Sequence, residues 1–346
     1  MPGAVLAAYG FGADVRAEPL GGGLINQTFV LRDGDGEVAA VLQRLHPVFG
    51  PAVNDDIDAV TRFLDDRGVL TPRLIHTTDG QCWVDHDGAC WRALTYVSGR
   101  TVDAIADPAQ ARSAGALVGR FHRVMAAYDG GFVHVRANVH DTATHLSKLD
   151  QRVADRADAG VVTGEALGLG RDILDRYQRV PAVYTARGRN VHGDLKISNV
   201  LFAADDATRA TCLIDLDTLG EQPLAFELGD MLRSWANPAG ESTPTPAIDA
   251  DIVAAALEGY ATEVAGLFEE AEYASIIPGL ELICIELAAR FCVDVFDDSY
   301  FAWDASVFAS RREHNLVRAR GQLALAESVA AQRAQLDRIC MRALGG

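Results

Sequence analysis

The residues best suited to chemistry lie in one segment, VHGDLKISNVLF, at Val191 to Phe202. Its four fixed positions are His192-x-Asp194-x-Lys196-x-x-Asn199, a pattern expected by chance in about one of 500 chains of this length. An aspartate can accept the proton of a hydroxyl, and an asparagine five residues later can hold Mg²⁺ beside nucleotide phosphates. A helix-capping aspartate beside a turn asparagine is the structural alternative. We predict a phosphotransfer loop in which Asp194 is the base, Asn199 holds the metal and Lys196 contacts the nucleotide.

A second group of carboxylates follows a short apolar strand at Thr211 to Ile214, in the sequence IDLDT. Asp215 stands at the end of this strand, where a carboxylate can bridge nucleotide phosphates through a metal ion. We predict Asp215 as a metal ligand. Asp217 lies two residues further on, and it can either join the metal shell or cap the following turn.

Two further polar residues are expected to support the loop rather than react. His192 is interpreted as hydrogen-bonding to backbone in the catalytic loop, because Asp194 already fills the role of the base. Asp230 lies in a helix that begins near Phe226. It can brace the catalytic loop through a hydrogen bond or cap its own helix, and we predict the bracing role.

A glycine-rich stretch, GGGLIN at Gly21 to Asn26, precedes the apolar run Thr28 to Leu31. A hairpin at this point can lay backbone N–H groups over phosphates. A triple glycine is also common in plain flexible turns, but its position ahead of the other motifs favours nucleotide binding. The candidates are Gly22, Gly23, Leu24, Ile25 and Asn26.

The first third of the chain is expected to be rich in β-structure. Thr28 to Leu31 and Val38 to Leu45 flank an Asp-Gly-Asp-Gly turn as a hairpin, and Cys90 to Val97 is a further strand. Between them, Asn54 to Arg67 carries apolar residues at helical spacing and is followed by glycine. This order predicts a small antiparallel β lobe with one helix.

From Val102 onward the pattern changes to amphipathic helices. One exception is a short hairpin formed by Asn199 to Ala203 and Thr211 to Asp215. The last helix is expected in one or two pieces. The expected helices are Pro108 to Ala127, Leu167 to Val180, Asp249 to Phe268, Ser275 to Val295 and Phe308 to Leu344.

These elements predict an α+β protein of two lobes. Residues 1–97 form the nucleotide-binding lobe, and residues 98–346 form a large, mainly helical lobe that carries the catalytic loop and the acceptor site. The lobes are joined near Tyr96 to Arg100. Thr95 and Val97, at this junction, are expected to contact the nucleotide.

Composition excludes several classes of function. The 346 residues carry 31 basic and 48 acidic side chains, a formal net charge of 31 − 48 = −17, which opposes binding to nucleic acid or to an anionic membrane. The longest apolar stretch, Ala274 to Phe296, is interrupted by charged residues, and Met1 to Arg16 lacks a secretory pattern. Six cysteines without C-x-x-C spacing indicate reduced, mostly buried thiols. We expect a soluble, cytoplasmic protein.

Taken together, these segments resemble the aminoglycoside phosphotransferase and choline kinase group of kinase-like enzymes. More narrowly, the chain resembles bacterial N-acetylhexosamine 1-kinases, and this resemblance is spread over nearly its full length. The matching segments are GLINQTF at Gly23 to Phe29 with VLQRL at Val41 to Leu45, HDT at His140 to Thr142, HGDLKISNVLF with IDLDT and ELGDMLR (Glu227 to Arg233), and RFCVDVFDDSYF with HNLVRARGQ at His314 to Gln322.

The resemblance implies a protein-kinase-like fold with ATP bound between the lobes and Mg²⁺ as the metal. It further implies that the acceptor is the anomeric hydroxyl of a hexose or N-acetylhexosamine, which gives a sugar 1-phosphate. The positions carried over to the sugar pocket are Arg290, Tyr300, His140 and Asp141.

The chain departs from the kinase pattern on its third strand, where a lysine usually contacts the phosphates. VLQRL offers Gln43 or Arg44 there, and strand alternation lets only one of them face the cleft. The helical glutamate that pairs with that lysine is also missing; Asp56 or Asp58 is the nearest carboxylate. Two alternatives therefore stay open: an aminoglycoside or choline-type kinase, whose cationic acceptor suits the acidic chain, and a nucleotide-binding pseudokinase.

Overall fold

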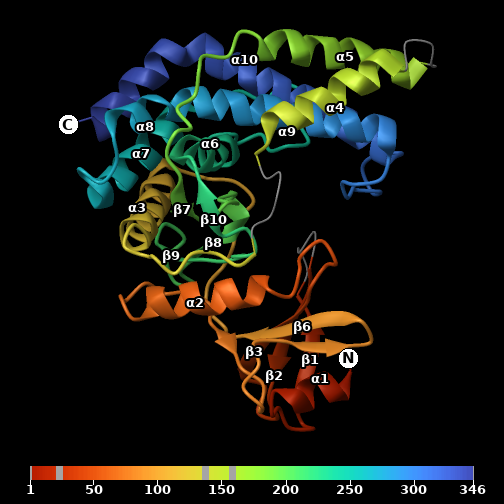
Figure 1. Ribbon diagram of the computed structural model, residues 1–346, viewed down its shortest axis with the longest axis vertical. Coiled ribbons are helices and arrows are strands. Elements are labelled where there is room, and N and C mark those ends of the chain that lie inside the picture. Colours follow the sequence, from red (N-terminus) through yellow and green to blue (C-terminus); the bar gives the residue numbers. More distant parts are fainter. Residues whose placement is uncertain (1, 21–25, 135–139, 156–160, 346) are drawn as a thin grey trace.

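The computed structural model describes residues 2–20, 26–134, 140–155 and 161–345. It has a small part built on an antiparallel sheet and a larger helical part, which lie at opposite ends of the view in Figure 1. The α+β prediction is confirmed. Within the described residues, no helix combines the length and apolarity needed to cross a bilayer.

Six strands of the described residues form the N-terminal sheet, in the order β1-β2-β3-β6-β4 with β5 paired to β6. All pairs are antiparallel. The expected hairpin is β2–β3, and in the next pair Gln43 of β3 lies opposite Arg92 of β6. The strands are β1 (Arg16–Pro19), β2 (Gln27–Arg32), β3 (Val38–Arg44), β4 (Leu74–Ile75), β5 (Val84–His86) and β6 (Ala89–Leu94).

Two hydrophobic clusters hold the small lobe. The outer cluster joins the short helix α1 (Gly3–Ala8) to the sheet and consists of eight buried residues: Val5, Tyr9, Leu31, Ala40, Leu42, Ala89, Trp91 and Ala93. Helix α2 (Val53–Asp65) instead buries its apolar face in the main core, which continues into the helical lobe. In Figure 1, α2 accordingly lies between the sheet and the large lobe.

The large lobe is built around α9, which is buried along nearly its whole length. Helix α10 runs as one piece, and α1, α4 and α8 were not expected from the sequence. Close helix packing explains one glycine, Gly115 of α3, because a Cβ there would collide with the backbone of Ala256 in α7. The helices are α3 (Pro108–Met125), α4 (Thr142–Asp155), α5 (Val161–Tyr177), α6 (Leu224–Trp235), α7 (Ala250–Val264), α8 (Glu270–Ala274), α9 (Ile276–Asp297) and α10 (Arg311–Leu344).

Two short strand pairs frame the segment that carries the predicted catalytic residues. β7 (Arg189–Val191) pairs with β10 (Gly220–Gln222), and β8 (Val200–Phe202) pairs with β9 (Ala210–Leu213). Between β7 and β8 the chain forms a loop that ends in a single 3₁₀ turn, Ile197–Asn199. The hairpin predicted from Asn199 to Ala203 and Thr211 to Asp215 is β8–β9, which follows this loop directly.

Candidate active site

The loop after β7 is bent sharply at Gly193. This residue has a φ of +82°, and a Cβ would collide with the carbonyl oxygen of Thr218, so only glycine fits. The Thr218 hydroxyl also donates to the carbonyl oxygen of His192 at 2.9 Å. The His192 ring in turn contacts backbone, with Nε2 3.0 Å from the oxygen of Ile214. The bend and these contacts fix the position of Asp194.

The Asp194 side chain accepts hydrogen bonds from two of the three other polar residues of the motif, Lys196 and Asn199. Lys196 Nζ lies 2.6 Å from Asp194 Oδ2, and Asn199 Nδ2 donates to the same oxygen at 3.1 Å and to the Asp194 carbonyl at 2.9 Å. Burial alone would raise the pKa of Asp194, but the Lys196 ammonium and these hydrogen bonds hold it below its ordinary value. Asp194 is therefore ionised at neutral pH, with part of its side chain exposed.

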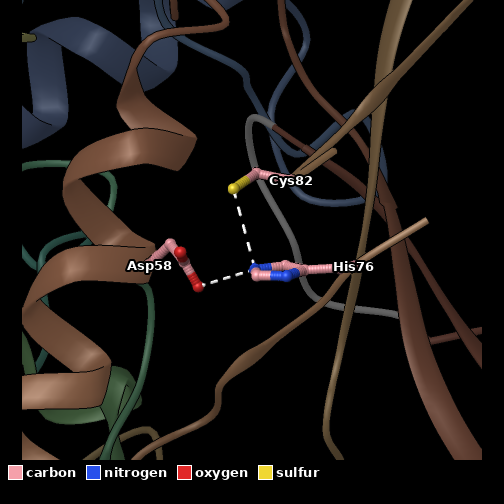
Figure 2. A group of neighbouring side chains, drawn as sticks. All are labelled: Asp58, His76 and Cys82. Carbon is pink, nitrogen blue, oxygen red and sulfur yellow. Dashed lines mark hydrogen bonds and ion pairs between the residues drawn. The ribbon is translucent and has the colours of Figure 1, made fainter. Parts of the chain in front are cut away.

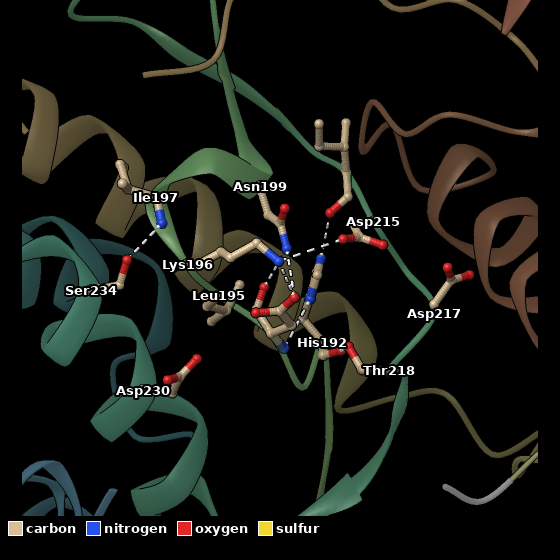
Figure 3. Close-up of polar contacts among 12 residues, drawn as sticks. His192, Leu195, Lys196, Ile197, Asn199, Asp215, Asp217, Thr218, Asp230 and Ser234 are labelled. Carbon is tan, nitrogen blue, oxygen red and sulfur yellow. Dashed lines mark hydrogen bonds and ion pairs between the residues drawn. The ribbon is translucent and has the colours of Figure 1, made fainter. Parts of the chain in front are cut away.

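Lys196 also extends toward Asp215, as Figure 3 shows, with 3.7 Å between Nζ and Oδ2. Asp215 follows β9 and adopts a left-handed φ of 66°, which directs its partly exposed side chain toward the loop. Burial, and then the nearby charges of Asp217 and Asp194, raise the pKa of Asp215. The carboxylates of Asp194 and Asp215 thus both lie beside the Lys196 ammonium group.

Asp217 makes a different set of contacts. Its side chain is 1% exposed; Oδ1 lies 2.5 Å from Arg92 Nη1, and Oδ2 accepts from Asn26 Nδ2 at 2.6 Å. Asn26 Oδ1 in turn accepts from the backbone of His46 at 2.9 Å. Both oxygens of Asp217 therefore hold groups of the small lobe, and its membership of a metal shell stays a prediction. Gly22, Gly23, Leu24 and Ile25 lie outside the described residues.

Arg92 is a site residue that the sequence analysis missed. It is 2% exposed, its Nε donates to Gln43 Oε1 at 2.8 Å, and its Nη1 lies 3.4 Å from Asn54 Oδ1 of α2. Gln43 thus belongs to the buried network, whereas Arg44 is exposed and contacts Gln27. Arg92 thus brings a guanidinium beside Gln43, one of the two residues that stand where a third-strand lysine is usual.

Helix α6 braces the catalytic loop through residues other than the expected one. Glu227, 1% exposed, accepts from the backbone amides of His192 and Gly193, both at 2.9 Å. Ser234 Oγ accepts from the Ile197 amide at 3.0 Å, as Figure 3 shows, and Trp235 Nε1 donates to the Leu195 carbonyl at 2.8 Å.

Asp230 lies on the same helix but accepts from Arg233 Nε at 2.9 Å. Its negative charge raises the pKa of both Lys196 and His140. The charge of Asp230 therefore acts both on the predicted catalytic loop and on the next group of predicted residues. A direct bracing hydrogen bond from Asp230 to the loop stays a prediction.

The predicted acceptor residues His140 and Arg290 gather around Glu286 of α9. His140 Nδ1 lies 3.4 Å from Glu286 Oε1, and Thr142 Oγ1 donates to Oε2 at 2.6 Å. Burial lowers the pKa of His140, but Glu286 outweighs burial and leaves that pKa raised. The Arg290 charge acts on both His140 and Glu286. Asp141 instead caps α4, accepting from the Thr144 amide at 3.1 Å.

Tyr300 is linked to Arg290 through one aromatic ring. Its side chain is 57% exposed and stands edge-on to Phe301 at 4.8 Å between centroids, and the Arg290 guanidinium lies 5.7 Å from the same ring. Asp294 holds this turn by accepting from the amides of residues 299–301 at 2.9 Å. Glu286 and Asp294 lie one turn from Arg290 on α9. Among the described residues, both form their hydrogen bonds and ion pairs with partners other than Arg290.

The junction between the lobes is fixed by backbone pairing. Arg100 and Phe202 exchange two hydrogen bonds of 2.8 Å, which join the junction to β8. Thr95 is exposed and pairs with Arg73 through its amide at 2.8 Å and its hydroxyl at 2.9 Å. Val97 is half-buried. Nucleotide binding by Thr95 and Val97 stays a prediction.

Solved structures with the same fold come from several small-molecule kinases. The chain is similar to an aminoglycoside phosphotransferase from Alicyclobacillus acidocaldarius, with 18% identity, a TM-score of 0.64, and 98% of this chain and 97% of that one covered. It is similar to the amicoumacin kinase hAmiN, with 16% identity, a TM-score of 0.60 and 93% and 91% covered. It also resembles a choline kinase from Cryptosporidium parvum, with 11% identity, a TM-score of 0.57 and 93% and 91% covered.

A family model extends this likeness from fold to sequence. The model of the phosphotransferase enzyme family, APH, matches residues 16–267. This range contains the catalytic loop, the Asp215 segment, Arg92 and the bracing helix α6. The chain therefore belongs to the phosphotransferase enzyme family.

Proposed function

We propose that this protein transfers the γ-phosphoryl group of ATP to a hydroxyl of a small molecule, with Mg²⁺ as the metal. The observation that carries the proposal is the convergence of Asp194, Lys196, Asn199 and Asp215 within hydrogen-bond or ion-pair distance. Phosphoryl transfer depends on positioning and on stabilising negative charge. This cluster supplies a base, a fixed cation and oxygen ligands for both tasks.

Asp194 is the base of the proposed reaction. The acceptor O–H bond breaks as its proton passes to Asp194, and the acceptor oxygen forms a bond to the γ-phosphorus. The bond from that phosphorus to the bridging oxygen breaks, and ADP leaves. The hydrogen bonds from Lys196 and Asn199 orient the carboxylate for this proton transfer. No covalent enzyme intermediate is required.

The residues present fit a divalent metal of the Mg²⁺ type. Asn199 Nδ2 is used twice on Asp194, which leaves Asn199 Oδ1 as a ligand, and Asp215 offers a partly exposed carboxylate. Carboxylate and amide oxygens are what Mg²⁺ prefers. When bound, the metal neutralises charge on the phosphate oxygens. The amicoumacin kinase structure, a complex with AMP-PNP and Ca²⁺, supports the pairing of a nucleotide with a divalent ion in this fold.

On the nucleotide side, Arg92 and Gln43 take the place of the missing third-strand lysine. Arg92 already pairs with Asp217, so the pair joins the sheet to the segment that carries Asp215. We propose that Arg92 is a positioning residue which holds the two lobes in the arrangement that ATP requires, together with Asn26, Thr95 and Val97 at the nucleotide. This ion pair supports an active enzyme over a pseudokinase.

For the acceptor we propose a neutral hexose or N-acetylhexosamine, phosphorylated at its anomeric hydroxyl. The carboxylates on the Arg290 side each have a protein partner: Asp230 has Arg233, and Glu286 has His140 and Thr142. A site for a polycationic acceptor needs carboxylates that are free to pair with ammonium groups. The narrower sequence resemblance to N-acetylhexosamine 1-kinases supports the same acceptor class.

An acceptor screen with Mg-ATP, read as ADP release, tests the proposal. We expect turnover with N-acetylhexosamines or hexoses, ³¹P NMR of the product showing an anomeric phosphate, and a kcat that falls more than tenfold in Asp194→Asn. Turnover only with aminoglycosides or choline-like cations would establish the alternative kinase class. Nucleotide binding without turnover of any acceptor would indicate a binding module.

A further inference from the structure

A cluster of three potential metal ligands lies on the small lobe, in residues that the proposed reaction does not use. Asp58 belongs to α2, His76 follows β4 directly, and Cys82 lies two residues before β5. One ligand atom from each lies within 4.8 Å of the others. Figure 2 shows the Asp58 carboxylate and the Cys82 sulfur both directed at one edge of the His76 ring.

Both contacts meet at the same ring nitrogen. His76 Nε2 lies 2.9 Å from Asp58 Oδ1 and 3.8 Å from Cys82 Sγ. A Cys–His–Asp relay for nucleophilic catalysis needs the thiol and the carboxylate on opposite ring nitrogens, so this geometry excludes such a relay. One proton on Nε2 can serve only one of the two neighbours well. A cation placed between the three atoms would satisfy all of them.

The distances suit a tetrahedral transition metal. Metal bonds of about 2.0–2.3 Å to N, O and S place neighbouring ligand atoms about 3.3–3.6 Å apart. The observed 2.9 and 3.8 Å lie on either side of this range, and small rotations of His76 and Cys82 bring both into it. The set of one thiol, one imidazole and one carboxylate favours Zn²⁺ over Mg²⁺ or Ca²⁺, which prefer oxygen.

The surroundings orient the ligands and leave one position open. Asp58 is 8% exposed in its side chain, and its second oxygen pairs with Arg62, which turns Oδ1 toward His76. The negative charges of Asp55 and Asp58 act on the Cys82 thiol and attract a cation. The His76 side chain is 40% exposed, so solvent can supply a fourth ligand.

We propose that Asp58, His76 and Cys82 form a binding site for Zn²⁺ or a similar transition metal, with water as the fourth ligand. The bound metal ties α2 to the segment between β4 and β5. Because α2 also carries Asn54, which contacts Arg92, an occupied site fixes the helix that reaches the buried Arg92–Asp217 pair.

Cobalt titration of the full-length, chelator-treated protein tests the site, since Co²⁺ bound to thiolate gives a charge-transfer band that oxygen ligands do not give. We expect one Co²⁺ per chain with this band, displaced by Zn²⁺. Cys82→Ser should abolish the band, and His76→Gln should weaken Co²⁺ binding at least about tenfold. Asp215→Ala should keep the band, which separates this site from the catalytic one.

Matched controls come from the same lobe. Cys90→Ser removes the other half-buried cysteine, and His86→Gln removes a histidine that also faces an aspartate but is not part of the three-ligand cluster found in the described residues. Both should bind Co²⁺ as the wild type does. Absence of the thiolate band in the wild type, or its persistence in Cys82→Ser, would overturn the proposal.

Discussion

Arg92 and Asp217 form a buried ion pair between the two lobes, with 2.5 Å between Nη1 and Oδ1 and at most 2% of either side chain exposed. They are 125 residues apart in the sequence. Arg92 comes from β6 of the N-terminal sheet, and Asp217 lies two residues after the predicted metal ligand Asp215. In the function proposed above, this pair takes the place of the lysine–glutamate pair that the sequence lacks, and it spans the lobes instead of lying within one.

Removing only one partner of this ion pair should strongly destabilise the folded protein. Arg92→Met leaves Asp217 charged and buried, and we expect a loss of about 3–5 kcal/mol in the free energy of unfolding. The double variant Arg92→Met/Asp217→Leu should recover most of this loss, measured by urea denaturation. As a control, Arg32→Met removes the exposed pair with Glu18 and should cost less than about 1 kcal/mol. If Arg92→Met and Arg32→Met lower the free energy of unfolding by similar amounts, burial of the Arg92–Asp217 pair does not explain its contribution.

Asp194→Asn should fold and bind nucleotide normally while kcat falls more than tenfold, a barrier increase above about 1.4 kcal/mol. The amide keeps the shape of the side chain but cannot take up the acceptor proton. Steady-state kinetics with the best acceptor of the screen give kcat and KM, and circular dichroism checks the fold. Retention of more than a tenth of the turnover would show that Asp194 is not the base.

Asp215→Ala should weaken both turnover and the dependence of nucleotide affinity on Mg²⁺, because a charged oxygen ligand is lost. A Mg²⁺ titration at fixed ATP measures this. Asp217→Asn is the informative comparison, since Asp217 is already held by Arg92 and Asn26. If Asp217→Asn shifts the Mg²⁺ requirement and Asp215→Ala does not, the metal ligand is Asp217.

Arg290→Ala should raise KM for an N-acetylhexosamine at least tenfold and change KM for ATP by no more than a few-fold. A guanidinium offers donors in a fixed geometry to hydroxyl or acyl oxygens. Arg290→Lys keeps the charge and loses that geometry, so its KM for the N-acetylhexosamine should lie between those of the wild type and Arg290→Ala. Equal changes in the two KM values would instead indicate a general disturbance of α9.

His314 should make the protein less stable as the pH falls from about 6.5 toward 4. Burial, and then the Arg318 charge, lower the pKa of His314 to about 4, while Asp304 and Glu241 oppose this weakly. Its Nδ1 accepts from the Asp304 amide at 3.2 Å and cannot also carry a proton. The unfolded chain therefore binds one proton more in this range, so stability decreases as the pH is lowered.

Urea midpoints at pH 7, 6 and 5 for the wild type and His314→Gln measure this effect. The other titrating groups are shared, so the difference between the two proteins isolates His314. The wild-type midpoint should fall more steeply with acidification. Parallel curves would show that folding leaves the pKa of His314 unchanged.

The convergence of Asp194, Lys196 and Asn199 could be predicted from the sequence because their contacts are local. The spacing of Asp194, Lys196 and Asn199 brings them together within one bend, whatever the rest of the chain does. Arg92 offered no such signal, since its place opposite Gln43 depends on the sheet register and its contact with Asp217 on how the lobes pack. Sequence patterns report neither.

The sequence also does not show which residue of α6 contacts the catalytic loop. Glu227 and Asp230 lie one turn apart on α6, so both face a similar direction. Only the way in which the helix docks decides that Glu227 receives the loop amides while Asp230 pairs with Arg233. Helix α4 was missed although Leu146, Leu149 and Val153 are buried at helical spacing.

The main hydrophobic core contains residues of both lobes, so neither lobe has a complete core of its own. Val53, Ile57, Val60 and Leu64 of α2 are buried together with residues of the helical lobe, so a fragment of residues 1–97 would expose a continuous apolar stripe. The outer cluster, with eight residues, is too small to stabilise such a fragment by itself. The two lobes should therefore unfold in one cooperative transition, and neither should fold to a stable state when it is expressed alone.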